Sequence, residues 1–355
     1  MSDEQALITA TVRRILSQTN VRSEGQIVVE WPSRSWRELE GAGLTGVGVE
    51  EARGGSGGSF TDVATALFEV GRHATLVPLA ETMLAGWLGG RSTWDWSGGP
   101  ETVSVGDAMN LVVRRNGTEL QLDGIIPAVP WARVATRILI VVDSEIGPLL
   151  ARLEPEDFTI EPGINLAGEY RDAVVLTSAR LISDRWQPSS ATTQEVRLRG
   201  ALMRAVSAAG CMSSILELTT AYAHDREQFG RPIEKFQAIQ QLLARLAAEV
   251  FASSICIRNA VTFVDAEDGA LASMSAVVRV SQAATNVARI AHQIHGAIGI
   301  TEEHSLHYFT SRLWCWRNEF GGETEWSREI SKYVRIHGGV NHLWSLMTEI
   351  NEEIS

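Results

Sequence analysis

The residues of this chain best suited to chemistry lie between Arg226 and Gln237, in the order Arg-Glu-Gln-Phe-Gly-Arg-Pro-Ile-Glu-Lys-Phe-Gln. Gly230 and Pro232 interrupt a helical pattern there, because glycine tolerates a left-handed cap and proline has no amide to continue the helix. Arginine offers a fixed fork of donors for phosphate oxygens, and glutamine can pair with the edge of a heterocycle. The segment indicates a corner that binds a phosphorylated ligand, although a solvated helix corner would show the same pattern.

A second segment of interest runs from His292 to Arg312 and begins His-Gln-Ile-His-Gly-Ala-Ile-Gly. Gln293 adds another carboxamide, and Gly296 and Gly299 are small enough to let a backbone approach a ligand closely. The alternative is a helix end followed by a glycine-rich turn. The segment alone does not decide between the two.

Both segments resemble signature motifs of the acyl-CoA dehydrogenase family. The first follows the family pattern RxQFGxPIxxFQ, and the second follows Q(I/V)xGGxG with Ala297 at the second glycine. The resemblance implies FAD as the cofactor and FAD contacts from seven residues: Arg226, Gln228, Phe229, Gln237, Gln293, Gly296 and Gly299. It also implies that these residues reach across a dimer interface to the FAD of a neighbouring subunit.

The resemblance further implies α,β-desaturation of a fatty or steroidal acyl-CoA thioester. A carboxylate would remove the α-proton while the β-hydrogen leaves as hydride to the flavin. Family members often carry this base as a Glu before a Gly, and counting from the second motif places Phe320 there, with Glu319 adjacent. Glu319 is therefore the candidate base, while a solvated acid at a helix end is the alternative. Another family location falls at Gly200, which has no carboxylate.

The surroundings expected for Glu319 are aromatic. Trp314, Trp316 and Trp326 lie close to it in the sequence, with Arg312 and Arg317 nearby. An apolar, aromatic-lined site would raise the pKa of a carboxylate and suit it to proton abstraction. Helix packing explains the tryptophans equally well. Glu323 and Glu325 are weaker candidates for the base.

Composition and the remaining residue types argue against several other functions. A net charge of −12 argues against a nucleic-acid partner, which needs a basic face. The histidines His292, His295, His304 and His307 lack fitting carboxylate or cysteine partners, so no metal site is predicted. Three cysteines without metal spacing indicate buried thiols in a reducing cytoplasm. The acidic start does not resemble a signal peptide, and no run approaches the roughly 18 apolar residues of a membrane span.

Periodicity divides the chain into three parts. Helices are expected over 3–18, 34–42, 61–72 and 78–90, then strands around an Asn116-Gly117 turn and over 137–142 and 172–177, and finally helices over 197–227, 234–266, 271–295, 302–318 and 323–350. The glycine-rich stretch 51–58 is expected to be a loop without a phosphate role. The prediction is an α+β multidomain protein with an N-terminal α-helical domain (1–100), a small middle β-barrel or sandwich (101–195) and a C-terminal four-helix bundle (196–355). This is the order of the acyl-CoA dehydrogenase fold.

The β part lacks two motifs that the resemblance leads us to expect, a TEPxxGSD-like loop and a WITN-like strand. Residues 103–110 and 124–132 stand in their place, and Trp131 either packs on the flavin ring or fills the barrel core. The missing motifs indicate pairing with a second, more complete homologous chain in an α2β2 assembly. A self-sufficient homo-oligomer, a non-catalytic partner that holds the neighbour's FAD, and a flavin oxidase or monooxygenase of the same fold remain open alternatives.

Overall fold

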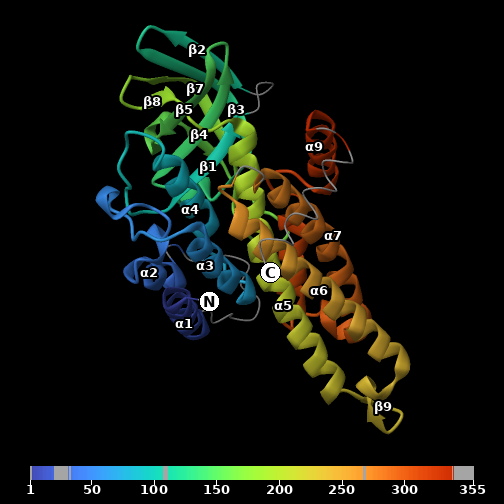
Figure 1. Cartoon of the computed structure of the whole chain (residues 1–355). Helices are drawn as coiled ribbons and strands as arrows, with labels where there is room; N and C mark the ends of the chain where they lie inside the picture. The colour runs from blue at the N-terminus through green and yellow to red at the C-terminus, as the bar shows by residue number, and fades with distance from the viewer. Residues whose placement is uncertain are drawn as a thin grey trace.

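The computed structural model describes residues 2–19, 31, 33–106, 111–266, 269–337 and 339, and the structural statements below concern these residues. Helices come first, a unit of two small sheets follows, and long helices complete the chain (Figure 1). The predicted α+β organisation is confirmed. The class of element changes between Gly89 and Glu101, and again between Pro188 and Thr193.

The N-terminal helices pack together on one flank of the long helix α5. Their bounds are α1 Asp3–Thr19, α2 Arg34–Gly41, α3 Phe60–Arg72 and α4 Leu79–Gly89. Ser59 caps α3 and forms a capping box with Asp62, which satisfies amides at the helix start. The glycine-rich stretch 51–58 is a loop, as expected, apart from a 3-10 turn at Glu51–Arg53 and an isolated bridge between Gly57 and Val49.

The middle unit consists of two four-stranded sheets with an apolar core between them. One has the order β1 (Glu101–Gly106), β4 (Arg137–Ser144), β5 (Gly147–Leu153), β8 (Trp186–Pro188); the other has β2 (Leu111–Asn116), β3 (Glu119–Pro130), β7 (Arg171–Leu181), β6 (Thr159–Glu161). The predicted hairpin is confirmed, since Asn116 pairs with Glu119 and Gly117 has a φ of 60°. Of the stretch 103–110, residues 107–110 lie outside the described residues.

Of the C-terminal helices, α6, α7 and α8 pack against α5, and α9 packs against α7 (Figure 1). Their bounds are α5 Thr193–Asp225, α6 Gln237–Phe263, α7 Gly269–His295, α8 Leu306–Trp316 and α9 Glu323–Ile336. Gly210 lets α5 cross α3 closely, because a Cβ there would lie 2.0 Å from the carbonyl oxygen of Phe68. The last helix is predicted to reach 350, but residues 338 and 340–355 lie outside the described part of the chain.

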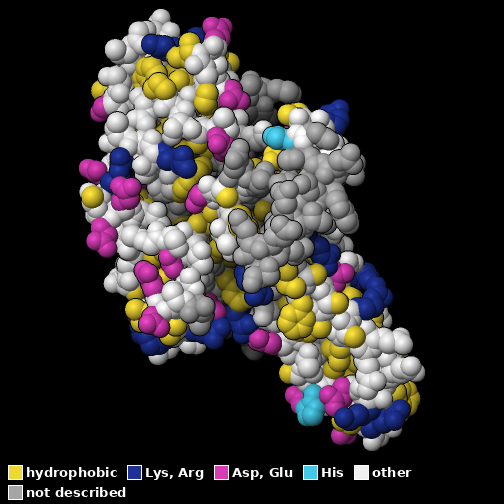
Figure 2. Space-filling model, in the orientation of Figure 1, with side chains coloured by type: hydrophobic (Ala, Val, Ile, Leu, Met, Phe, Trp, Pro, Cys, Tyr) yellow, Lys and Arg dark blue, Asp and Glu magenta, His cyan; other side chains and the backbone are white. Residues whose placement is uncertain are grey.

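Two of these helices are unusually apolar. The sequence predicts no membrane span, yet α5 and α6 each contain an 18-residue window with a mean hydropathy of 1.3. The window in α5 is 78% buried, so α5 is a core helix. The window in α6 is only 33% buried. Phe251 and Ile255 of α6 are 63% and 61% exposed, and hydrophobic side chains gather over this helix in Figure 2.

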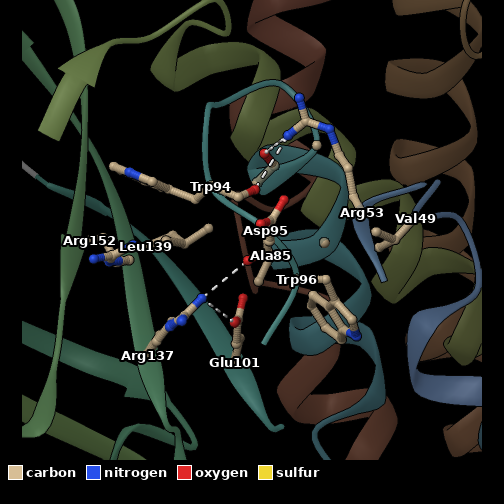
Figure 3. Close-up of a pocket in the computed structure, with 13 residues that line it drawn as sticks. Val49, Arg53, Ala85, Trp94, Asp95, Trp96, Glu101, Arg137, Leu139 and Arg152 are labelled. Carbon is tan, nitrogen blue, oxygen red and sulfur yellow. Dashed lines mark hydrogen bonds and ion pairs between the residues drawn. The ribbon is translucent and has the colours of Figure 1, made fainter. Parts of the chain in front are cut away.

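A polar joint holds α4 and the segment after it against the β unit (Figure 3). Arg53 donates to the carbonyl oxygen of Ser92 at 2.8 Å, and Arg137 donates to that of Asp95 at 3.2 Å. Arg137 also lies 3.6 Å from Glu101, whose pKa is raised by burial. The cavity between these groups measures about 10 Å³, room for roughly one water molecule. This cluster therefore joins two parts of the chain and does not offer a ligand site.

Candidate functional site

The first motif forms an exposed hairpin at the far end of α5 (Figure 1). Helix α5 ends when the amide of Arg226 bonds to the carbonyl oxygen of Tyr222 at 2.9 Å. Two short strands follow, β9 (Glu227–Gln228) and β10 (Arg231–Pro232), and the turn between them places Phe229 at φ 53° and Gly230 at φ 78°. Two successive positive φ angles are typical of a tight hairpin turn. The sequence predicts a helix break here but not a hairpin.

The side chains of this hairpin are open to solvent. Phe229 is 93% exposed, and Arg226, Gln228 and Gln237 are exposed as well. A Cβ at Gly230 would meet no atom within 4 Å. A large, exposed aromatic ring beside exposed polar side chains is the composition expected of a binding surface. The donor set suits a diphosphate joined to a heterocycle, so these residues fit the predicted cofactor.

The second motif occupies the end of α7 and the 3-10 turn η6 (Gly296–Ile300). Gln293 is exposed, and Gly296 has a φ of 66° with open space around it. Gly299 differs, because it is buried and a Cβ there would lie 2.9 Å from that of His295. Its small size serves the packing of the turn itself, while Gln293 and Gly296 face outward.

Tyr222 brings the two motifs together. Its ring stacks on His295 with 4.4 Å between centroids, and its hydroxyl donates to the carbonyl oxygen of His295 at 3.3 Å. The predicted FAD-contacting segments thus share one end of the bundle. Arg204, which contacts Glu319, lies roughly 33 Å from Arg226 along α5, calculated from the helical rise of 1.5 Å per residue. The two motifs and Glu319 therefore lie at different levels along α5.

Glu319 lies just after α8, and two guanidinium groups hold it. Arg204 donates from Nε to Oε2 at 2.6 Å, and Arg171 donates from Nε to Oε1 at 2.9 Å, with a further contact from its Nη2. The side chains of Arg204 and Arg171 are 6% and 8% exposed, and that of Glu319 is 16% exposed. Both carboxylate oxygens are therefore engaged in a largely buried ion-pair cluster.

The cluster continues to two more acids and spans all three parts of the chain. Arg204 also contacts Glu81 of α4, and Arg171 donates to Glu169 at 2.8 Å. Burial alone would lower the pKa of Arg204, but Glu319, Glu81 and Glu169 outweigh it and raise that pKa. Burial would raise the pKa of Glu169, but Arg171, Arg204 and Arg312 hold it at about 2. Burial raises the pKa of Glu81 although Arg204 opposes it.

The prediction that Glu319 lies in an apolar, aromatic-lined site is wrong. Trp316 turns its Nε1 to Glu169 at 3.0 Å, and that of Trp326 donates to the carbonyl oxygen of Gly321 at 3.1 Å. Trp314 is 39% exposed and stacks on Arg317 outside the cluster. The cavity beside Glu319 measures about 10 Å³, which leaves no room for an acyl chain in this arrangement.

The other positions considered for the catalytic base are Gly200, Glu323 and Glu325, and they lie near Glu319. A Cβ at Gly200 would be 2.8 Å from the ring of Phe320, so the two family locations meet in space with an apolar ring between them. Glu323 accepts from Gln282 at 2.9 Å on the outside of α9. Glu325 pairs with Arg197 at 2.6 Å, with both side chains 37% exposed. Neither acid joins the Glu319 cluster.

The histidines and Trp131 have packing roles in the structure. His295 is buried, and this burial lowers its pKa to about 4. Among the described residues no group of three His, Cys, Asp or Glu side chains is placed to hold a metal ion. Trp131 is 1% exposed and lies against Trp31 at 5.9 Å and Tyr170 at 5.0 Å. Its full burial among protein rings favours packing over contact with a flavin.

Sequence reasoning missed four of the clustered residues, Glu81, Glu169, Arg171 and Arg204. A signal for two of them exists. Glu81 and Arg204 are single charges in long apolar helical runs, Pro-Leu-Ala-Glu-Thr-Met-Leu and Ala-Leu-Met-Arg-Ala-Val. Buried charges require partners, so two isolated charges of opposite sign on core helices predict a pair. Glu169 and Arg171 carry no such signal in their polar segment.

Comparison with known proteins agrees with this architecture. The N-terminal domain model of the acyl-CoA dehydrogenase family matches residues 2–90, and its C-terminal domain model matches residues 193–332. Acyl-CoA dehydrogenase IpdE2 of Mycolicibacterium smegmatis is 28% identical over 321 residues, which cover 88% of this chain and 93% of that protein.

Solved structures show the same fold. One is the ChsE4-ChsE5 complex from Mycobacterium tuberculosis (TM-score 0.87, 21% identity, covering 94% of this chain and 97% of that chain). Another is a variant of the steroid acyl-CoA dehydrogenase Tcur3481-Tcur3483 (TM-score 0.83, 24% identity, covering 93% and 97%). The two domain models together span more than half of the sequence in the observed order of elements, and the chain belongs to the acyl-CoA dehydrogenase family of oxidoreductases.

Proposed function

We propose that this chain is one subunit of an FAD-dependent acyl-CoA dehydrogenase that desaturates an acyl-CoA thioester together with a homologous partner subunit. One observation carries the proposal. Arg226, Gln228 and Phe229 lie exposed at the outer end of the bundle, roughly 33 Å along α5 from the level of Glu319. Residues suited to FAD but remote from the chain's own candidate base serve a flavin whose other half belongs to a neighbour.

Each exposed residue of the two motifs suits a different part of FAD. Arg226 suits the diphosphate because its guanidinium presents paired donors. Gln228, Gln237 and Gln293 suit heterocycle edges, and Phe229 offers a ring face. Gly296 leaves space for close approach. FAD, when bound, supplies the acceptance of hydride; these residues hold and orient it.

The partner surface includes the outer face of α6. This helix directly follows the hairpin, its Phe251 and Ile255 are exposed, and hydrophobic side chains gather over it in Figure 2. A gathering of exposed apolar side chains of this kind is typical of a protein interface. A homologous subunit is supported by the similarity to a chain of the ChsE4-ChsE5 complex. The names of the similar proteins support a bulky, steroid-type acyl group.

Proton abstraction is assigned to Glu319 within this proposal. Among the three carboxylates of the cluster, it is the one at the position expected from the second motif, and its contacts with Arg204 and Arg171 fix its position. Both of its oxygens accept hydrogen bonds from arginine, so neither is free to take a proton in this arrangement. Catalysis by Glu319 therefore requires that substrate binding displace at least one of Arg171 and Arg204.

A second candidate function follows from the same contacts. Both oxygens of Glu319 accept from arginine, and the adjoining cavity of about 10 Å³ holds no acyl chain. These observations favour a non-catalytic subunit that completes the partner's flavin site while its own site is closed by the ion-pair cluster.

Co-expression tests the proposal. The chain is purified alone and with a homologous subunit from the same operon, and absorbance near 450 nm reports flavin. We expect flavin only in the co-purified assembly, and its bleaching by an acyl-CoA. Full flavin and bleaching in the chain alone would overturn the need for a partner, and a flavin-free assembly would overturn FAD binding.

Glu319→Gln in the active assembly separates the two candidates. Loss of turnover with flavin retained supports Glu319 as the base. Retained turnover assigns the chemistry to the partner and supports the non-catalytic role. Glu325→Gln, which changes a half-exposed acid on α9, is the matched control.

A further inference from the structure

The segment that carries Glu319 connects α8 to α9 and contacts α5 at two points. Glu319 accepts from Nε of Arg204 at 2.6 Å. The next residue, Phe320, lays its ring on Gly200, where an added Cβ would lie 2.8 Å from two carbons of the ring. Gly200 and Arg204 are four residues apart in α5 and therefore lie on one face of the helix, one turn from each other. Two adjacent residues of the segment thus contact two adjacent turns of one helix.

Phe320 has an unfavourable backbone conformation. Its φ is 57°, and that of Gly321 is 104°. Glycine accepts such angles freely, whereas a Cβ makes the left-handed region costly for phenylalanine. A conformation of this kind persists only where the surrounding contacts hold it. Here the ring of Phe320 lies on Gly200, and Nε1 of the buried Trp326 donates to the carbonyl oxygen of Gly321 at 3.1 Å. The segment is therefore held on both sides of the strained residue.

Gly200 also opposes its local preference. It lies within α5, where glycine is less favourable than alanine because it loses more conformational freedom on folding. An alanine there would overlap the ring of Phe320, since its Cβ would lie 2.8 to 2.9 Å from three ring carbons. Two positions far apart in the sequence thus both give up local stability for one contact. Conflicts of this kind with local preference are expected at functional sites.

The conformation at Phe320 determines the direction of the Glu319 side chain. Because the following residue is held by its hydrogen bond from α9, a change of φ at Phe320 would turn the chain on the side of Glu319. The carboxylate reaches Arg204 with Oε2 at 2.6 Å and Arg171 with Oε1 at 2.9 Å. These arginines come from α5 and the β unit, and a hydrogen bond weakens steeply as its angle departs from linear. A rotation at Phe320 would therefore break at least one of the two contacts.

From these contacts we infer that Phe320 is a positioning residue for Glu319. While its ring lies on Gly200, the neighbouring carboxylate is directed to Arg204 and Arg171. When the ring leaves Gly200, the carboxylate is released from the two arginines. Within the proposed function, on which this step rests, departure of the ring precedes proton abstraction by Glu319.

A double-mutant cycle tests the inference through thermal unfolding of the full chain, in the assembly in which it purifies. The wild type, Glu319→Gln, Phe320→Ala and the double variant are compared. Without the ring the carboxylate is no longer directed to its partners, so Glu319→Gln should then lower Tm by less than about half of the loss that it causes in the wild type. Equal losses in the two backgrounds, within about 1 °C, would overturn the inference.

Three further backgrounds separate positioning from a general loss of packing. Gly200→Ala places a Cβ where the ring lies and should reduce the Glu319→Gln loss as Phe320→Ala does, whereas Phe320→Leu keeps an apolar side chain there and should restore most of it. Phe158→Ala removes a partly buried ring from the core of the β unit, and as the control it should lower Tm but leave the Glu319→Gln loss unchanged. A reduced loss in this control would assign the effect to general destabilisation and overturn the inference. The cycle measures stability and not turnover, so its result stands even if FAD binding or the role of Glu319 as base fails.

Discussion

Replacing Glu319 by glutamine tests whether the ion-pair cluster exists as described, independently of catalysis. The buried cluster holds equal numbers of acidic and basic groups, namely Glu81, Glu169 and Glu319 with Arg171, Arg204 and Arg312. Glutamine keeps the shape of the side chain but removes its charge. The cluster then carries one positive charge in excess within the protein interior.

The expected loss of unfolding free energy follows from the burial of the ion-pair cluster. Removing one member of a buried ion pair destabilises a protein by about 3–5 kcal/mol. With an unfolding entropy of about 2.1 cal/mol/K per residue, the 355 residues give about 0.75 kcal/mol/K. Glu319→Gln should therefore lower Tm by about 4–7 °C. Glu325→Gln breaks a pair in which both partners are 37% exposed, and such pairs contribute about 0–1 kcal/mol, or at most about 1 °C.

The assay is thermal unfolding followed by calorimetry on the wild type and both variants at one protein concentration and pH 7. A residue that acts only as a base in an open site would leave Tm unchanged or raise it when neutralised. If Glu319→Gln and Glu325→Gln melt within about 1 °C of each other, the ion-pair cluster does not stabilise the chain, and the reasoning is refuted.

Three further predictions concern acid stability, helix packing and the exposed hairpin. The pKa of Glu169, lowered to about 2, contributes stability that is complete above its ordinary pKa and is lost as pH falls from about 4.5 toward 2; Glu169→Gln should flatten the dependence of urea unfolding on pH in that window, and an unchanged slope would contradict it. Gly210→Ala places a Cβ 2.0 Å from a backbone oxygen of Phe68 and should lower the free energy of unfolding by about 1–3 kcal/mol or more, whereas Gly41→Ala has open space and should be neutral within about 1 kcal/mol. Phe229→Ala should leave Tm of the isolated chain unchanged, because the ring is 93% exposed, but lower the flavin content of the assembly; equal flavin content would remove this ring from the cofactor site.

Much of the architecture can be predicted from local signals. The Asn116-Gly117 turn predicts a hairpin, because successive positive φ angles suit these residue types, and β2 and β3 pair there. The helices of the C-terminal part follow from apolar periodicity, and the bounds of α5 to α8 differ from those expected by a few residues, while the expected end of the last helix at 350 lies outside the described residues. The hairpin at Phe229 could not be predicted this way, because a phenylalanine with positive φ opposes its own local preference and depends on the flanking strands.

The candidate base shows more clearly what local sequence patterns cannot predict. The position of Glu319 after α8 is predictable from its spacing to the second motif, but its surroundings are not. Arg171 comes from the β unit and Arg204 from α5, and they are 148 and 115 positions away from Glu319 in the sequence. No local pattern connects such residues. Trp314, Trp316 and Trp326 are neighbours in sequence, yet helix geometry sends them to different contacts.

The sequence by itself determined the family, the order of helical and β parts, and the two segments that carry the exposed donors, since each of these depends on short-range patterns of residue type. Only the tertiary structure decided that both segments meet at one end of α5 through Tyr222, and that the opposite region is closed by paired charges. The reason is physical. The pattern of residue types along the chain decides locally whether a helix or a strand forms. The free-energy cost of burying Glu81 and Arg204, in contrast, is offset only when the folded chain brings these two distant residues together as a pair.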